Sequence, residues 1–283
     1  MSVLLALLAS LLWGTSDFLG GTLSRRMASF DVVAGSQAIA LVVLTVLALG
    51  PLDAHVTLAC VLWSIAAGVV GLLALGAFYR GLAEGTMGVV APIAATGVAV
   101  PVIVGVIGGD HLSPLQVVGI VVAVLGVVAA GGPDVRAARA GGLRHRPVLL
   151  AVVAALGFGA VLLFIAKGSE SSVLVTLLVM RLSAVVCLGT VALALRRRPT
   201  IARPDLPVLA GVGMLDLAAN AAYGIATRSA LVSLAAVLAS LYPVVTVVLA
   251  RQIHAERLSR SQLIGAVAAI CGGALIAFTG SGA

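Results

Sequence analysis

The chain has 283 residues, of which 61% are hydrophobic and only 10% are charged, and its formal net charge is +7. Soluble domains carry about 25% charged residues, so this chain has too few charges to cover a surface that faces water. The composition excludes an ordinary soluble domain and indicates a polytopic membrane protein. Nucleic acid is excluded as a partner because the arginines lie in short gaps between apolar runs, and the lipid bilayer is the expected partner.

Ten apolar runs are long enough to cross a membrane, since a spanning helix needs about 20 mostly apolar residues. A spanning sheet would need alternating segments of about 10 residues, whereas these runs are longer and apolar on all sides. The fold class is therefore expected to be all-α, with ten transmembrane helices. The expected spans are 3–22, 32–50, 58–79, 87–108, 115–131, 148–167, 173–195, 207–227, 231–252 and 261–280.

One polar motif occurs twice at an offset of 146 residues, as "DHLSPLQVVG" from Asp110 and "ERLSRSQLIG" from Glu256. Each copy lies just before the last span of one half of the chain. An acid and a serine at a helix start stabilise its free N–H groups. The motif therefore predicts two helix starts and requires no chemistry.

The duplication extends beyond this motif, because several pairs recur at offsets of 144 to 146 residues. The pairs are Trp13-Gly14 with Phe158-Gly159, Gln37 with Arg181, Tyr79 with Tyr223, and Gly126 with Gly272. They predict a five-helix repeat over 1–131, a linker over 132–147 and a second five-helix repeat over 148–283. Five is an odd number of spans, so the second repeat is expected to be inverted, which is an architecture of alternating-access transporters.

The distribution of Lys and Arg predicts the orientation in the cell membrane. The gaps on one side contain 14 of these residues, and the gaps on the other side contain two. Because positive charge gathers on the cytoplasmic side, both termini are expected to lie outside the cytoplasm.

Three ionisable residues fall well inside the spans, namely Asp17, Arg181 and Asp216. Each costs about 2.5–3.5 kcal/mol on insertion scales, so such residues are candidates for function. Helical spacing gives spans one and eight each a polar and aromatic stripe, which predicts a cavity. The candidate substrate-binding residues are Trp13, Ser16, Asp17, Tyr79, Phe158, Arg181, Asp216, Asn220, Tyr223 and Tyr242. The alternative is that their polar groups only bond neighbouring helices.

Two acids against one base within the spans suggest proton coupling. We expect Arg181 to pair with Asp17, which leaves Asp216 as the carboxylate that binds and releases a proton. Asp216 and Asp17 are the two candidates for this role. Three prolines, Pro92, Pro101 and Pro243, interrupt spans and are candidate hinges, the alternative being tolerated kinks.

Three stretches together resemble the EamA-type drug/metabolite transporters. They are "LLWGTSDF" (11–18), Arg181, and "PVVTVVLARQIHAERLSRSQLIGAVAAICGGALI" (243–276). The resemblance implies ten helices in two inverted five-helix repeats that form a solute carrier, often an exporter. It also implies a central cavity lined by spans one, three, four, six, eight and nine. Many relatives have cytoplasmic termini, which is the opposite of what the charge count predicts here.

The expected function is secondary transport of a small metabolite or drug across the cytoplasmic membrane, with proton-coupled export as the finer expectation. Nucleotide-binding and hydrolase motifs are absent from the sequence, so we expect no enzyme activity and no cofactor. The histidines are far apart and the cysteines unpaired in sequence, so we expect no metal site. An intramembrane lipid enzyme or a lipid flippase is the alternative, and a partner protein without a substrate is a third. We expect a functional monomer, with a dimer as the alternative.

Overall fold

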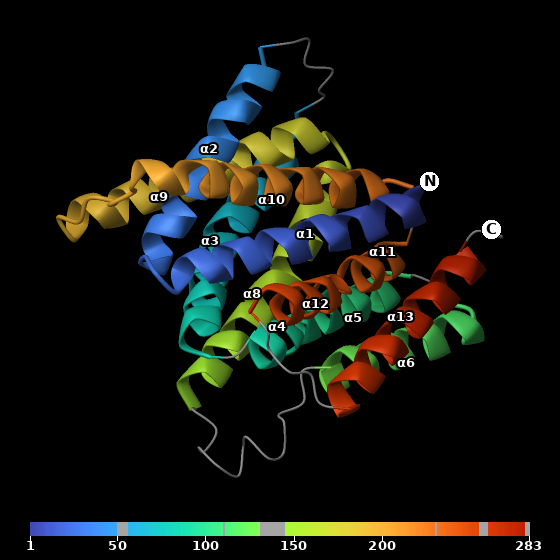
Figure 1. Ribbon diagram of the computed structural model, residues 1–283. Helices are drawn as coiled ribbons and strands as arrows, with labels where there is room; N and C mark the ends of the chain where they lie inside the picture. Colours follow the sequence, from blue (N-terminus) through green and yellow to red (C-terminus); the bar gives the residue numbers. More distant parts are fainter. Residues whose placement is uncertain are drawn as a thin grey trace.

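The computed structural model describes residues 1–49, 56–85, 87–109, 111–130, 145–229, 231–254 and 260–280, and these are helical with short connections and no strand (Figure 1). The helices of the first half are α1 (Ser2–Ser24), α2 (Ser29–Leu47), α3 (Leu58–Glu84), α4 (Met87–Ala95), η1 (Thr96–Val98), α5 (Ala99–Ile107) and α6 (Pro114–Ala130). Those of the second half are α8 (His145–Ser169), α9 (Val173–Ala194), η2 (Arg203–Asp205), α10 (Leu206–Ala226), α11 (Val232–Ala239), α12 (Tyr242–His254) and α13 (Arg260–Gly280).

Eight helical stretches of the described chain are long and apolar enough to cross a membrane. Two of them combine shorter helices, Met87–Ile107 and Val232–His254, and α6 and α13 each contain a further, shorter apolar stretch. Large apolar residues also face outward, such as Leu73, which is 66% exposed, and Ile107, which is 82% exposed. Because soluble monomers rarely expose large contiguous apolar patches, this surface is suited to a lipid environment.

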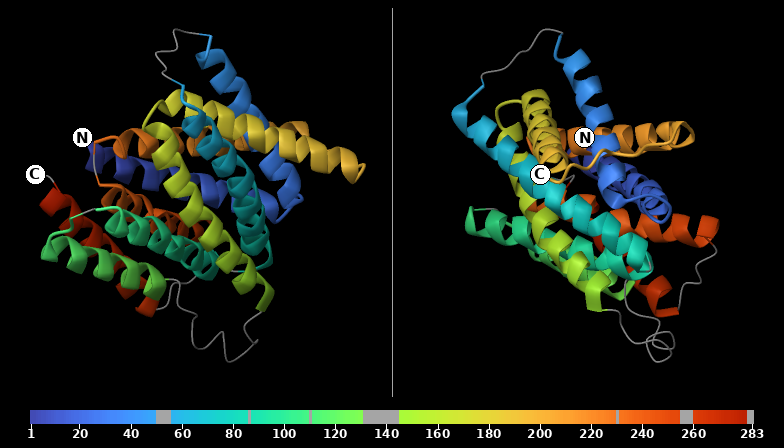
Figure 2. Two further views of the ribbon diagram at one scale, coloured as in Figure 1. Left: turned by 180° about the vertical axis from the view of Figure 1, so that it is seen from behind. Right: turned by 90° about the vertical axis from the view of Figure 1, so that its left-hand side faces the viewer.

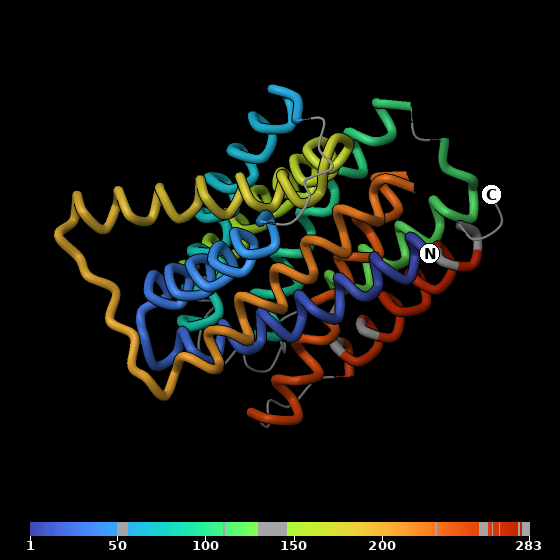
Figure 3. The backbone as a smooth tube through the Cα atoms, turned by 90° about the horizontal axis from the view of Figure 1, so that it is seen from above, coloured from blue at the N-terminus to red at the C-terminus, as the bar shows by residue number. Residues whose placement is uncertain are grey.

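The helices pack in pairs taken from the two halves of the chain. Helix α6 lies along α13 at one edge of the molecule, while α3 packs against α8 and α1 against α10 (Figures 1, 2 and 3). Glycines allow some of these close contacts, since small residues let helix backbones approach one another in a membrane. A Cβ atom at Gly126 would overlap the backbone of Ala269, and one at Gly272 would overlap the backbone of Ala123.

Two of the long apolar stretches are broken near their middle. The 3₁₀ turn η1 separates α4 from α5, and residues 240–241 separate α11 from α12. The Thr96 hydroxyl donates to the Ile93 carbonyl oxygen at 2.7 Å, and the Ser240 hydroxyl donates to the Val237 carbonyl oxygen at 2.8 Å. These bonds help to satisfy backbone groups that the breaks leave without a helical partner.

The first copy of the duplicated motif begins a helix, as its sequence predicts. The Ser113 N–H donates to the Gln116 side-chain oxygen at 2.8 Å, and the Gln116 N–H donates to the Ser113 hydroxyl at 3.3 Å. This reciprocal arrangement is a capping box, and Pro114 provides the first residue of α6. Asp110 and the second copy from Glu256 to Ser259 lie outside the described residues.

Helix α8 begins at His145, three residues before the start of the predicted span 148–167. Residues 145–147 of the expected linker over 132–147 are therefore helical. The polar "RHRP" sequence concealed this start, although proline is well tolerated in the first turn of a helix. The rest of the linker lies outside the described residues.

Candidate functional site

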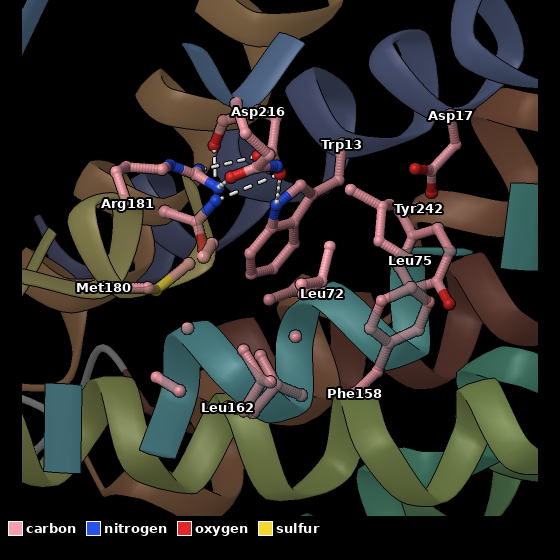
Figure 4. Close-up of a pocket in the computed structure, with 18 of the residues that line it drawn as sticks. Trp13, Asp17, Leu72, Leu75, Phe158, Leu162, Met180, Arg181, Asp216 and Tyr242 are labelled. Carbon is pink, nitrogen blue, oxygen red and sulfur yellow. Dashed lines mark hydrogen bonds and ion pairs between the residues drawn. The ribbon is translucent and has the colours of Figure 1, made fainter. Parts of the chain in front are cut away.

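A cavity lies among the middles of the long helices and encloses about 710 Å³, open solvent at its mouth included (Figure 4). Both halves of the chain contribute to its wall. The first half provides Trp13, Asp17, Gln37, Ala67, Gly68, Gly71, Leu72 and Leu75. The second half provides Phe158, Val161, Leu162, Met180, Arg181, Ala184, Asp216, Asn220, Ala239, Ser240 and Tyr242.

A buried ion pair between Arg181 of α9 and Asp216 of α10 occupies one end of the cavity (Figure 4). The distance from Arg181 Nη2 to Asp216 Oδ2 is 2.6 Å, and the Arg181 Nη1 group donates to Gln37 Oε1 at 2.5 Å. Arg181 is only 2% exposed. A guanidinium this deeply buried is tolerated because its charge is compensated and two of its nitrogens donate to oxygen acceptors.

Two neutral donors complete the surroundings of the Asp216 carboxylate. Trp13 Nε1 donates to Asp216 Oδ1 at 3.2 Å, and Asn220 Nδ2 donates to the same oxygen at 3.0 Å. Asn220 is one helical turn beyond Asp216 on α10 and also donates to its backbone oxygen at 2.6 Å. The Asp216 carboxylate therefore accepts hydrogen bonds from α1, α9 and its own helix. The bond from Trp13 also fixes the position of the Trp13 ring in the cavity wall.

The prediction that Arg181 pairs with Asp17 is wrong, and so is the related choice of Asp216 as the unpaired acid. Spacing along a helix shows which residues share a face, but it does not show which neighbouring helix that face meets. In the structure α9 directs Arg181 toward α10 and α2. Asp17 lies farther along α1, on the other side of Trp13 (Figure 4).

Asp17 occupies the opposite end of the cavity and is only 7% exposed. No hydrogen bond or ion pair joins its carboxylate to another described residue. Its surroundings include the rings of Trp13, Phe158 and Tyr242 (Figure 4). The cavity therefore has one end where charges are paired and one end where a buried carboxylate has no partner in the described part of the chain.

Apolar side chains form the wall between these ends. Leu72 and Leu75 come from α3, Leu162 comes from α8 and Met180 from α9 (Figure 4). Gly68 and Gly71 line the cavity on the α3 side, and a Cβ atom at Gly68 would overlap the Met180 carbonyl oxygen, so this glycine lets α3 pack closely against α9. An apolar wall with a few fixed polar groups is typical of small-molecule sites.

Three of the residues predicted to bind substrate do not line this cavity. Ser16 is buried and donates to the Val212 carbonyl oxygen at 3.0 Å, as the alternative reading of the polar stripe expected. Tyr79 is buried against Gly20, and the buried ring of Tyr223 lies behind Trp13 with the ring centroids 5.8 Å apart. The other seven, Trp13, Asp17, Phe158, Arg181, Asp216, Asn220 and Tyr242, all line it.

The cavity also includes residues that were not predicted as site residues. Gln37 was recognised only as the repeat counterpart of Arg181, yet the two side chains bond directly. Ser240 lies at the break between α11 and α12, where a hydroxyl residue next to a proline-containing helix start could have signalled it. Helices α2 and α9 contribute to the wall, whereas no residue of α4 or α5 is among the lining residues given above.

No cluster of three or more His, Cys, Asp or Glu side chains that could hold a metal ion gathers in the parts of the chain that the structure describes. The groups available to a ligand in the cavity are one carboxylate, the polar edge of the Arg181 network, aromatic rings and aliphatic side chains. Such a set is suited to binding and orienting a small molecule.

Comparisons with known proteins agree with this geometry. The model of the EamA-like transporter family matches residues 1–131 and 145–278. A crystal structure that carries no functional name has the same fold, with a TM-score of 0.76 and 18% identity over 99% of this chain and 97% of that one. No curated protein matches the chain. Because the family model covers nearly the whole sequence and the fold is a bundle of long apolar helices, the chain is a multi-pass membrane protein that belongs to the EamA-like transporter family.

Proposed function

We propose that this protein is a secondary transporter that moves a small metabolite or drug across the cell membrane by alternating access. The observation that carries the proposal is the cavity itself. It lies at the middle of the long helices, both halves of the chain line it, and it holds a buried carboxylate that bonds no other described residue. Such midplane sites between repeats are characteristic of secondary transporters. A monomer is proposed as the functional unit.

We further propose ten spans arranged as two inverted repeats, with α6 and α13 as the fifth and tenth. Equivalent glycine contacts support this arrangement. A Cβ atom at Gly14 would overlap the Tyr242 carbonyl oxygen, and one at Gly159 would overlap the Gly97 carbonyl oxygen. Both the two glycines and the two carbonyl residues are 145 positions apart. In one contact the first half contributes the glycine and the second half the carbonyl oxygen, and in the other contact these contributions are exchanged. Such an exchange is expected for two repeats related by a two-fold axis.

The same exchange occurs at two other places. Gly126 meets Ala269 while Gly272 meets Ala123, and both the glycines and the alanines are 146 positions apart. Gln37 and Arg181 are 144 positions apart and bond to each other. A contact between two equivalent residues is expected on a pseudo-two-fold axis.

Hinge motion is proposed at the breaks in the fourth and ninth spans. Pro92 and Pro101 flank the break at η1, and Pro243 lies in the first turn of α12. Thr96 and Ser240, which bond backbone oxygens beside the two breaks, are 144 positions apart. Discontinuous helices in corresponding positions of two repeats are a feature of transporter binding sites. The breaks are therefore suitable points for the bending that alternating access requires.

Proton coupling is proposed at Asp17 instead of Asp216. The Arg181 guanidinium already compensates the Asp216 charge, whereas the Asp17 charge has no compensation among the described residues. A buried carboxylate of this kind is stabilised by binding either a proton or a cation. Alternation between the two would couple movement of cargo to movement of protons.

Export requires a defined orientation, and we propose that both termini lie outside the cytoplasm. Reporter fusions at Ala283 test this proposal, since alkaline phosphatase is active only outside the cytoplasm and green fluorescent protein is fluorescent mainly inside it. The 14-to-2 distribution of positive residues predicts phosphatase activity without fluorescence. Fluorescence without phosphatase activity would contradict the proposed orientation and would place the C-terminus in the cytoplasm.

Transport itself is tested with purified protein in proteoliposomes. A thermal-shift screen over amines, amino acids, nucleosides and sugars selects a ligand, and counterflow of the labelled ligand is then measured. Counterflow above that of protein-free liposomes is the expected result, because a carrier exchanges cargo without an energy source. Bound ligand without counterflow would contradict transport. Movement of labelled phospholipid between the leaflets in the same vesicles would favour the lipid flippase instead.

A further inference from the structure

We propose that Asp17 and the aromatic rings around it form a subsite for the ammonium group of a monovalent, largely apolar organic cation. This inference rests on the proposed transport function, because it names the class of cargo for the same cavity. It follows from the charges of the lining residues, from the bonds that Arg181 already makes to Gln37 and Asp216, and from the apolar and aromatic side chains of the wall.

The charge of the cavity points to a cargo with one positive charge. Its ionisable lining residues are Asp17, Arg181, Asp216 and Tyr242, and Arg181 and Asp216 compensate each other. With the tyrosine neutral, the ionised Asp17 carboxylate leaves one net negative charge in a buried space. A single ammonium group restores neutrality, while a dication or an anion would leave a net charge behind.

The geometry of Arg181 disfavours a cargo with a carboxylate. Its Nη1 group donates to Gln37 and its Nη2 group donates to Asp216. Each of these two nitrogens carries a second N–H, while the Nε–H has no partner among the described residues and is buried out of reach of a water-sized molecule. A cargo carboxylate would have to share Nη1 or Nη2 with Gln37 or Asp216, and it would bring a second negative charge next to the Asp216 carboxylate. Among the described lining residues, the cavity thus offers a cation an uncompensated carboxylate but offers an anion only a guanidinium whose charge Asp216 already compensates, which favours an amine over an amino acid.

The remaining walls fit the rest of such a molecule. Trp13, Phe158 and Tyr242 surround the Asp17 end with ring surfaces (Figure 4), and ring faces attract ammonium groups. Leu72, Leu162 and their apolar neighbours form the wall beyond the rings. A compact amine with an aromatic or aliphatic body matches each of these features.

Binding to the purified full-length protein in detergent tests the proposal directly. The chain has two tryptophans, and Trp63 stacks on Phe164 outside the cavity lining. Trp63→Phe therefore leaves Trp13 as a fluorescent reporter within the cavity. Three probes share a benzene ring and differ in charge, namely 2-phenylethylamine, phenylalanine and 3-phenylpropionate.

The expected result is a saturable change in Trp13 fluorescence with 2-phenylethylamine and none with the zwitterion or the anion. Asp17→Asn is expected to weaken amine binding by about thirtyfold or more, because it removes one member of a buried charge pair. Asp17→Glu should retain much of the affinity. Glu170→Gln is the matched control, since it removes an exposed acid that pairs with Lys167 and should leave binding unchanged. Monodisperse gel filtration shows that each variant is folded.

Several outcomes would overturn the subsite. They are binding of phenylalanine or phenylpropionate as tight as that of the amine, unchanged amine binding in Asp17→Asn, or no saturable change with any of the three probes. Failure of the transport function has a different signature, which is Asp17-dependent amine binding without counterflow. Conversely, counterflow of a zwitterion or anion without amine binding would overturn the subsite and leave the transport function standing.

Discussion

Arg181→Ala is expected to lower the stability of the protein by about 3–5 kcal/mol, since removing one partner of a buried ion pair leaves the other charge uncompensated. The change removes the counter-charge of Asp216 at 2.6 Å and the donor to Gln37 at 2.5 Å. Both contacts hold α9 against α10 and α2. Thermal unfolding of the variant in detergent, compared with the unchanged protein, measures the loss.

A double-mutant cycle separates the ion pair from general damage to packing. Asp216→Asn removes the charge but keeps an oxygen that can accept from Trp13 and Asn220. Arg181→Met fills part of the space of the arginine and avoids an unpaired base. The double variant Arg181→Met with Asp216→Asn should be clearly more stable than the sum of the two single losses predicts, because neither charge is left alone. Strict additivity would show that the pair has no energetic coupling.

Asp17→Asn is expected to abolish the response of transport to a pH gradient, because asparagine cannot bind and release the proton. Transport is measured in proteoliposomes with trimethyl(2-phenylethyl)ammonium, a permanently charged probe that crosses lipid slowly, and with a dye that reports internal pH. In the unchanged protein, an inward gradient of the probe should move protons outward. In Asp17→Asn, both probe uptake and proton movement should fall to the level of protein-free liposomes.

The comparison with Asp216→Asn distinguishes the two acids. Asp216→Asn should reduce transport together with thermal stability, because it breaks the ion pair with Arg181. Asp17→Asn should reduce transport with little loss of stability, since the Asp17 carboxylate has no bonded partner among the described residues. Gradient-driven transport at the normal rate in Asp17→Asn would exclude Asp17 as the coupling residue. Glu170→Gln again provides a control for the loss of one negative charge.

The sequence predicted most helix positions closely because membrane insertion depends on local properties. A spanning helix satisfies its backbone hydrogen bonds within its own segment and meets lipid with its own side chains. The predicted span 207–227 corresponds to Leu206–Ala226, and 173–195 corresponds to Val173–Ala194. The prolines indicated interruptions in spans four and nine. The positions of the breaks at 96–98 and 240–241 were not apparent, since they depend on contacts between helices as well as on proline.

The sequence by itself therefore determined the all-helical membrane class, the helical segments, the duplicated residues and most of the polar residues of the cavity. It could do so because hydropathy, helix-capping motifs and repeat offsets depend only on the order of residues along the chain. Only the tertiary structure decided that Arg181 meets Asp216 and Gln37, that Asp17 has no bonded partner among the described residues, and that Tyr79 and Tyr223 are packed away from the cavity. The physical reason is that a helix face can meet any of several neighbours, and the choice is made by packing between segments far apart in the sequence.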